Sequence, residues 1–101
     1  MLWPDGKRKR WRVKLTCKVK VKNALGIHTR PAAAIVKLLQ PRKAAVSFTY
    51  KNETINARSI MSILMLAARK NAMIEITIDG EDAEMTMTHL LAAFEHEFGE
   101  K

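Results

Sequence analysis

The sequence predicts an α+β domain of two layers, in which a four-stranded antiparallel sheet carries three helices, two long and one short, on one face. Several short segments alternate apolar and polar residues, which is typical of strands with one face in solvent. Two longer segments repeat apolar residues at i, i+3, i+4 and i+7, which indicates helices with a single buried stripe. The elements follow the order β-α-β-β-α-β-α, and helices packed on one face of the sheet bury all of these stripes together.

The first predicted strand spans residues 13–22, where apolar side chains alternate with lysine and threonine. Period-two alternation places one set toward the core and the other toward solvent. The inward set is Val13, Leu15, Cys17, Val19 and Val21. We therefore expect the lysines to form a solvated face, and we expect the chain's single cysteine, Cys17, to be an inert core thiol.

A loop with Gly26 as its pivot follows, and the first helix is expected to begin near Pro31. Proline suits the first helical position because the N–H that it lacks would have no partner there. The helical spacing of apolar residues continues to Leu39, and Pro41 then ends the helix.

Residues 45–50 are predicted to form the second strand, and residues 54–56 a short returning strand. Residues 51–52 form a plausible tight turn between them, since asparagine tolerates the left-handed conformation. The segment 59–68, SIMSILMLAA, predicts a short apolar helix, which Asn71 could close in left-handed geometry.

The last strand is predicted over residues 74–78, followed by a turn at 79–80 and a final helix over 82–98. The first turn of this helix is rich in acidic residues, which favours the positive end of the helix dipole. Its apolar face contains Ala83, Met87, Leu90, Leu91, Phe94 and Phe98.

Charge is distributed unevenly along the 101 residues, a length that fits one domain. Residues 1–72 contain 17 basic and two acidic residues, whereas residues 73–101 contain one basic and eight acidic residues. A basic excess of this kind favours an anionic partner, such as nucleic acid, an anionic membrane, phosphate or an acidic protein surface.

Residues 1–12 are expected to form a basic, flexible N-terminal extension, and residues 13–101 the folded domain. Trp3 and Trp11 lie among the bases of this extension and could stack on the bases of a nucleic acid strand, or cover the flank of the domain. The single cysteine indicates a reducing compartment, so we expect a cytoplasmic protein. No apolar run approaches the ~18 residues of a membrane span, so no membrane insertion is expected.

The stretch LGIHTRPAA, residues 25–33, places a histidine just before a predicted helix start. The positive helix end favours the neutral ring of His28, whose free nitrogen lone pair is a nucleophile. Unpaired backbone N–H groups at a helix start form an anion site, and we expect them around Arg30, Ala32 and Ala33. The guanidinium of Arg30 can clamp phosphate oxygens, so these features together could accept and hold a phosphoryl group.

Simpler interpretations of these residues remain open. His28 could be an ordinary surface histidine and Arg30 a solvated charge, because a His-x-Arg-Pro string is short. Ser59, which precedes the short apolar helix, could be an ordinary N-cap. His89 and His96 have no cysteine or carboxylate at a zinc-ligand spacing, so we expect no metal site.

Two strings resemble one known family. GIHTRPAA resembles the active-site motif of HPr, the histidine-containing phosphocarrier of the bacterial phosphoenolpyruvate-dependent sugar phosphotransferase system. NARSIMSIL, residues 56–64, resembles the regulatory-serine helix of that family, and the separation of His28 from Ser59 fits without a gap. The resemblance covers residues 13–97 and implies the family's fold, an open-faced β-sandwich. The basic extension is not part of the usual family pattern.

The resemblance implies roles for individual residues. His28 would be phosphorylated on Nδ1 by enzyme I, which is charged by phosphoenolpyruvate, and would pass the group to an enzyme IIA domain. Arg30 would assist the transfer, and Pro31 corresponds to the proline that starts the helix. Ser59 corresponds to a serine that an HPr kinase/phosphorylase modifies in many bacteria, which lowers phosphotransfer. Such a protein is a covalent phosphoryl-transfer intermediate rather than an ordinary enzyme, needs no cofactor, and is expected to be a monomer.

The short helix is apolar nearly all round, which is more than one buried face requires. Some of its apolar side chains should therefore be exposed for partner docking, unless they simply fill the core. The docking candidates, from this helix and the first one, are Thr29, Ala33, Ile60, Met61 and Leu64.

Two other functions remain as alternatives. One branch of the HPr family serves regulatory phosphorelays that have no transporter. From charge alone, the chain could instead be a basic nucleic-acid-binding module that uses KRKRWR and the lysine strand, although the resemblance does not favour nucleic acid as a partner.

Overall fold

A single antiparallel sheet contains four strands: β1 (Val13–Lys20), β2 (Ala45–Tyr50), β3 (Glu53–Asn56) and β4 (Met73–Gly80). The computed structural model describes residues 13–100, so the expectations for residues 1–12 lie outside the described residues. Across the sheet the strand order is β1-β4-β2-β3, and every neighbouring pair is antiparallel.

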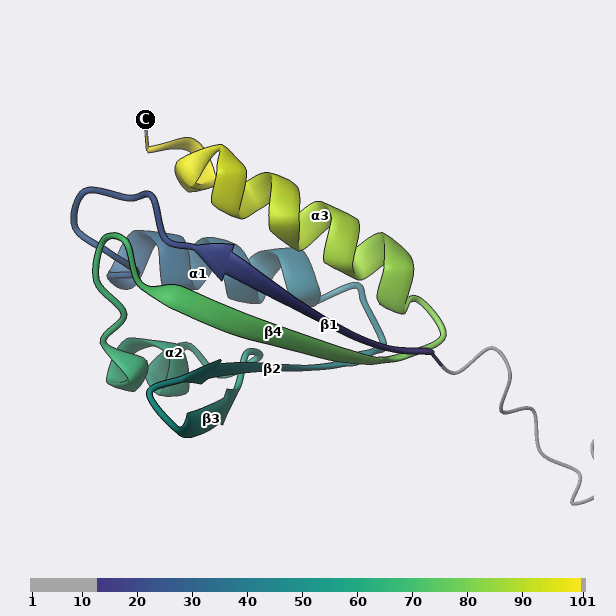
Figure 1. The fold of residues 1–101 in the computed structure, drawn as a ribbon. Coiled ribbons are helices and arrows are strands. Elements are labelled where there is room, and N and C mark those ends of the chain that lie inside the picture. Colours follow the sequence, from purple (N-terminus) through teal and green to yellow (C-terminus); the bar gives the residue numbers. More distant parts are fainter. Residues whose placement is uncertain (1–12, 101) are drawn as a thin grey trace, which may run out of the picture.

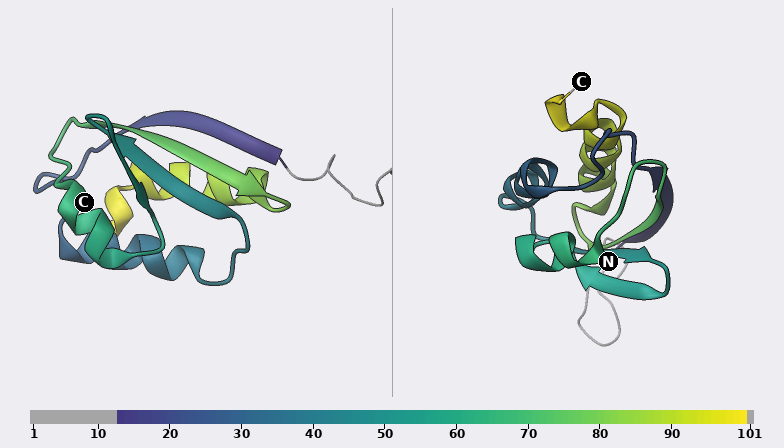
Figure 2. Two further views of the ribbon diagram at one scale, coloured as in Figure 1. Left: turned by 90° about the horizontal axis from the view of Figure 1, so that it is seen from below. Right: turned by 90° about the vertical axis from the view of Figure 1, so that its left-hand side faces the viewer.

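The helices all lie on one face of this sheet (Figure 1, Figure 2). They are α1 (Thr29–Leu39), α2 (Ile60–Leu66) and α3 (Ala83–Glu95), and a 3₁₀ turn, η2 (Glu97–Gly99), follows α3. The predicted fold class, a four-stranded antiparallel sheet with two long helices and one short helix on one face, is therefore confirmed. The η2 turn was not predicted.

The core lies between the two layers and centres on β4, which has a hydrogen-bonded strand on each side. Ile74, Ile76 and Ile78 point toward the helices and are fully buried. Phe48 of β2 meets Phe94 of α3 edge to face, with ring centroids 6.0 Å apart. This geometry is the one that aromatic rings prefer, and it joins the sheet to α3.

The inward side of β1 is only half-buried, because β1 is an edge strand of the sheet. Cys17 faces the core as predicted, but it is partly accessible rather than fully buried. The lysines of β1 are exposed, as expected.

The first helix begins two residues earlier than predicted, at Thr29 rather than near Pro31. His28 is its N-cap residue, with extended backbone angles. Pro31 is therefore the third helical residue, and its missing N–H still costs nothing there, because the first N–H groups of a helix have no intrahelical partner.

Two other helix ends also differ from the prediction. The second helix ends at Leu66, where Ala67 adopts the left-handed conformation (φ 54°), whereas Asn71 (φ 74°) lies in the turn before β4. The third helix ends at Glu95 instead of continuing to Phe98, which itself has a φ of 54°. Helix ends depend on tertiary hydrogen bonds as well as on local residue preference, so these boundaries were the least predictable features.

The two predicted turns have different outcomes. Lys51 and Asn52 both have positive φ and connect β2 to β3 as a tight hairpin, as expected. The predicted turn at Asp79 and Gly80 is wrong, because both residues belong to β4 and pair with the start of β1. A Cβ on Gly80 would lie 2.7 Å from the Cα of Ala44, so the strand requires glycine at this position.

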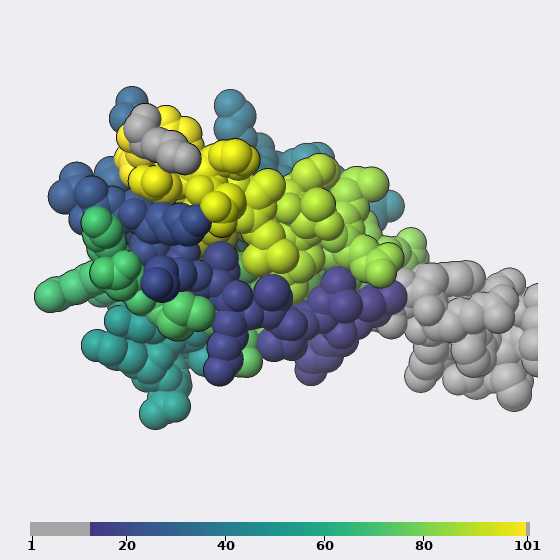
Figure 3. Space-filling view, turned by 45° about the horizontal axis from the view of Figure 1, so that its top comes forward, coloured from purple at the N-terminus to yellow at the C-terminus, as the bar shows by residue number. Residues whose placement is uncertain are grey.

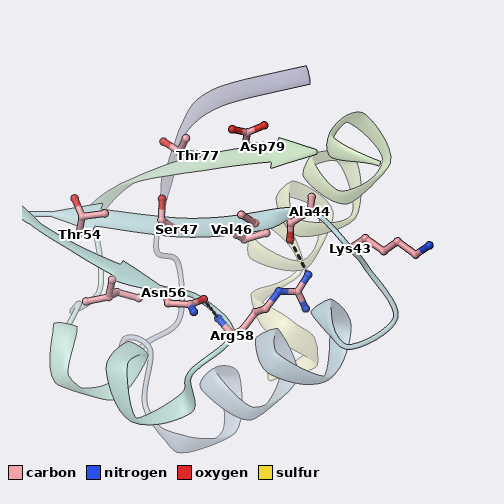
Figure 4. A pocket seen from close by; sticks show the side chains of 11 residues that line it. Lys43, Ala44, Val46, Ser47, Thr54, Asn56, Arg58, Thr77 and Asp79 are labelled. Carbon is pink, nitrogen blue, oxygen red and sulfur yellow. Dashed lines mark hydrogen bonds between the residues drawn. The ribbon is translucent and has the colours of Figure 1, made fainter. Parts of the chain in front are cut away.

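Helices α1 and α2 run antiparallel, as two sets of hydrogen bonds show. The guanidinium of Arg58, just before α2, donates to the carbonyl oxygens of Leu39 (2.6 Å) and Ala44 (2.7 Å) near the end of α1, the latter drawn in Figure 4. At the other end, the N–H of Ile27 donates to the carbonyl of Ala68 (2.9 Å), just after α2. The start of α1 therefore lies beside the end of α2.

Candidate functional site

His28 occupies the N-cap position of α1 without forming the usual side-chain cap. Its ring makes no hydrogen bond to the first backbone N–H groups of the helix, and about a third of the side chain is exposed (35%). Residues with short oxygen-bearing side chains stabilise this position best, so a histidine here is not explained by helix stability.

The loop before His28 is held against the segment that follows α2. The N–H of Val21 donates to the carbonyl of Ala72, and the N–H of Asn71 donates to the carbonyl of Val21. Gly26 has a φ of 73°, and a Cβ at this position would lie 2.4 Å from the carbonyl oxygen of Ala68. Only glycine permits this approach, which fixes the backbone on which His28 is mounted.

Unpaired backbone donors surround the start of α1. Within residues 13–100, no group accepts a hydrogen bond from the backbone N–H of Thr29 or Arg30. The expectation that included Ala32 and Ala33 was wrong: the N–H of Ala32 donates to the carbonyl of His28 (3.0 Å), and Ala33 lies further inside the helix. The helix starts earlier than predicted, so the free donors are also earlier. The free N–H groups and the positive end of the helix dipole both favour binding of an anion at this position.

Arg30 is exposed on the first turn of α1. Its side chain has no hydrogen-bond or ion-pair partner in the described part of the chain. A solvated guanidinium two residues from His28 can reorient toward an incoming anion and bind two of its oxygens at once.

Two side chains at this site were missed by the sequence analysis. Nε2 of His28 lies 3.0 Å from Oε2 and 3.2 Å from Oε1 of Glu100. Nδ2 of the buried Asn23 donates to Oε1 of Glu100 at 2.6 Å. Figure 3 shows the yellow C-terminal turn against the blue segment that leads from β1 to α1. Glu100 is 72 residues from His28 in sequence, and no local pattern could have indicated their contact.

Four of the five docking candidates are exposed. Thr29, Ala33, Ile60 and Met61 are exposed, whereas Leu64 is half-buried and packs against the core. Two further large apolar side chains near these candidates are also exposed, although the sequence did not indicate them as docking residues. They are Leu25 (78% exposed), before His28, and Met65 (74% exposed), near the end of α2.

Ser59 is the N-cap of α2, and its Oγ accepts a hydrogen bond from the N–H of Ser62 at 3.2 Å. The structural interpretation of this serine is therefore correct. Because α1 and α2 are antiparallel, Ser59 lies toward the C-terminal end of α1, and His28 lies before its N-terminal end.

In the part of the chain that the structure describes, no group of three or more His, Cys, Asp or Glu side chains is arranged to hold a metal ion. No helix between residues 13 and 100 has the length and hydropathy needed to cross a bilayer. A hollow of about 560 Å³ beside β2 is lined by residues such as Ser47, Thr54 and Arg58 (Figure 4), and none of its lining residues belongs to α1 or to the loop that carries His28.

Comparison with known proteins places the chain in a family. The family model PTS-HPr, described as the PTS HPr component phosphorylation site, matches residues 15–96. The chain belongs to the HPr family. The phosphocarrier protein HPr of Chlamydia pneumoniae is 49% identical over 80 residues, which cover 79% of this chain and 74% of that protein. HPr of Xylella fastidiosa (strain Temecula1) is 36% identical over 80 residues, covering 79% of this chain and 90% of the relative.

Solved HPr structures have the same fold. A Thermoanaerobacter tengcongensis HPr superposes with a TM-score of 0.82 at 29% identity, covering 86% of this chain and 98% of that one. HPr from Bacillus anthracis superposes with a TM-score of 0.77 at 34% identity, covering 80% and 96% of the two chains. The protein is thus an HPr phosphocarrier of the phosphotransferase system, and its fold is the open-faced sandwich of HPr.

Proposed function

We propose that His28 accepts a phosphoryl group on Nδ1 from phospho-enzyme I and passes it to an enzyme IIA domain of sugar transporters. The observation that carries this proposal is the position of the ring: His28 occupies the N-cap position of α1, next to two unpaired backbone N–H groups and the exposed Arg30. A nucleophile and an anion site are therefore adjacent, and both are accessible to a partner protein.

The transfer needs only groups that are present at this site. The lone pair on Nδ1 of the neutral ring attacks phosphorus, a nitrogen–phosphorus bond forms, and the bond to the donor atom of enzyme I breaks, leaving its electron pair on the donor. The N–H groups of Thr29 and Arg30 and the Arg30 guanidinium offset the negative charge on the phosphoryl oxygens. Onward transfer is the same reaction in reverse, with the acceptor as nucleophile.

An exposed site suits a carrier whose substrates are proteins. Enzyme I and enzyme IIA would dock on a surface formed by Thr29, Ala33, Ile60, Met61 and Leu64, with Leu25 and Met65 added to it. Exposed methionines adapt to partner surfaces of different shape, which favours recognition of more than one partner. We place the carrier in the cytoplasm, as a monomer formed by residues 13–101 with residues 1–12 as an extension.

Ser59 is the proposed regulatory phosphorylation site, modified by an HPr kinase. A phosphate at the N-cap of α2 would meet the positive end of that helix, so the fold can accept it. The added charge would lie beside Ile60 and Met61 and would oppose docking of enzyme I.

The test of the carrier function combines the purified chain with enzyme I and phosphoenolpyruvate, followed by intact-mass measurement. The wild-type chain should gain about 80 Da, the mass of one PO₃ unit, and the label should be lost in acid but kept in base. H28A should gain nothing, R30A should gain the same mass more slowly, and a chain without residues 1–12 should behave as wild type.

Three results would count against this function. A wild-type chain that gains no mass, while an authentic HPr does under the same conditions, would contradict it. So would a mass gain in H28A, or a label that survives acid.

A further inference from the structure

The C-terminal turn brings a carboxylate to His28 from the other end of the chain. Nε2 of His28 lies within hydrogen-bond distance of both carboxylate oxygens of Glu100, at 3.0 Å and 3.2 Å. The Glu100 side chain is more buried than the ring that it meets, with exposed fractions of 17% and 35%. The carboxylate is therefore a component of the site rather than a solvated surface charge.

An unusual backbone turn after α3 brings Glu100 to the His28 ring. Three consecutive residues after α3, Glu97, Phe98 and Gly99, have φ values of 54°, 54° and 81°. Left-handed geometry costs free energy at residues other than glycine, and it persists only where surrounding contacts hold it. Here the Phe98 ring packs edge to face on the Phe94 ring, with ring centroids 4.9 Å apart, and the N–H of Glu100 donates to the carbonyl of Glu97 at 3.0 Å.

Asn23 holds the same turn from the side of β1. It is 1% exposed, and its Nδ2 donates both to the carbonyl of Glu97 (2.9 Å) and to Oε1 of Glu100 (2.6 Å). A buried amide whose two N–H groups both donate to this turn holds the carboxylate in place beside the histidine. Asn23 thus orients the Glu100 side chain, and Glu100 in turn contacts His28.

The contact determines which ring nitrogen carries the proton. An ionised carboxylate has no proton to donate, so Nε2 of His28 must be the donor. A neutral imidazole has one ring proton, so Nδ1 then keeps its lone pair. We propose that Glu100 is a positioning residue, which holds the proton on Nε2 of His28 and thereby presents Nδ1 to the phosphoryl group. This inference rests on the proposed carrier function of His28.

The same carboxylate also acts during transfer. When a PO₃ group bonds to Nδ1 and the donor bond breaks, the ring keeps its Nε2 proton and becomes positively charged. Glu100 faces that growing charge from the Nε2 side, away from the phosphoryl oxygens. An interaction that strengthens as the reaction proceeds lowers the barrier rather than only the ground state.

The positioning role can be tested on the unphosphorylated protein by ¹⁵N NMR of the His28 ring at neutral pH. In the wild type, couplings to the ring protons should place the proton on Nε2 and the lone pair on Nδ1. E100A should shift the ring toward the tautomer mixture of free imidazole, and E100Q should keep the Nε2 proton, because its amide oxygen still accepts. E97Q is the matched control: it removes a charge from the same turn, but no hydrogen bond from the described residues reaches that side chain.

The kinetic arm measures the initial rate of phosphorylation by enzyme I. We expect E100A to be about tenfold slower than wild type, E100Q about threefold slower, and E97Q unchanged. A proton found on Nδ1 in the wild type, or identical ring spectra for wild type and E100A, would overturn the proposal, as would equal rates for wild type and E100A. If the wild type is not phosphorylated at all, the carrier function fails, whereas the ring spectra still decide the positioning role.

Discussion

A single glycine determines whether His28 can sit where it does. The loop that carries His28 approaches the end of α2 so closely that the N–H of Ile27 reaches the carbonyl of Ala68. Gly26 makes that approach with a φ of 73°, a conformation that side chains other than glycine adopt with difficulty. The histidine is therefore positioned by a residue that carries no chemistry itself.

Gly26→Ala should destabilise the protein for two reasons, the positive φ and a Cβ 2.4 Å from a carbonyl oxygen. We expect a loss of about 3 kcal/mol in the free energy of unfolding. Gly99→Ala is the matched control, because Gly99 also has positive φ (81°) but nothing within 4 Å of the added Cβ. It should cost about 1 kcal/mol. Urea unfolding with unchanged m-values would measure both, and equal losses would show that the close contact is not important.

At the scale of elements, the segment that connects α1 to β2 is held by two side chains that lie just before α2 and α3. Arg58, before α2, donates to three carbonyl oxygens of this junction. Asp82, before α3, accepts the backbone N–H groups of Lys43 and Ala44, each at 3.0 Å. The acidic start of α3 was expected to complement its own helix dipole, but the Asp82 carboxylate makes no cap hydrogen bond to that helix. It instead joins the start of α3 to the segment between α1 and β2.

The hydrogen bond from the Lys43 N–H lowers the pKa of the Asp82 carboxyl below its usual value of 3.8, and the Ala44 N–H and nearby Arg42 act in the same direction. A lowered pKa in the folded state contributes stability above pH 4, and that contribution is lost as the pH falls through the folded pKa. Asp82→Asn should therefore cost about 1 kcal/mol at pH 7. The deficit should begin to shrink as the pH falls below about 4, and it should be lost only below the lowered pKa of folded Asp82, where the carboxyl is protonated in the folded state as well. Chemical unfolding at pH 7 and pH 3 would measure it, and a deficit that is constant with pH would contradict the assignment.

At the scale of the whole molecule, the uneven charge along the sequence is partly balanced in space. Two of the three lysines of β1 lie opposite acidic residues of β4, with Lys14 beside Asp79 and Lys18 beside Glu75. Lys22 forms an ion pair with Glu95 of α3 at 2.6 Å. The lysine strand is therefore not an isolated cationic surface of the kind that nucleic-acid binding would favour.

The placement of the two proposed phosphorylation sites also belongs to this scale. His28 and Ser59 lie toward opposite ends of α1, which is about 16 Å long at 1.5 Å per residue. Ser59→Asp should therefore raise the KM of enzyme I for the carrier about tenfold and leave kcat nearly unchanged, because the added charge opposes docking rather than chemistry. Steady-state phosphorylation at varied carrier concentration would measure both constants.

Ser59→Ala is the control for loss of the α2 cap. It should cost about 1 kcal/mol of stability without raising KM, whereas aspartate retains a capping oxygen. A fall in kcat at constant KM in Ser59→Asp would show that the charge acts on the reaction instead.

Residue pattern alone was sufficient for the fold class, the order of the elements, the hairpin at Lys51 and Asn52, and the location of His28 just before the first helix. These features depend on local periodicity, turn preference and short motifs, which are properties of neighbouring residues. The same local preferences misplaced the ends of three helices and the last turn, because hydrogen bonds from distant segments decide where a helix or a strand stops.

Only the tertiary structure showed that Asn23 and Glu100 belong to the site of His28. It also showed that the free N–H groups at the start of α1 belong to Thr29 and Arg30, and not to Ala32 and Ala33. The first of these depends on the path of the chain across 72 residues, and the second on a helix start shifted by two residues. Contacts between segments far apart in sequence arise from packing the helices on the sheet, and no short window of residues encodes that packing.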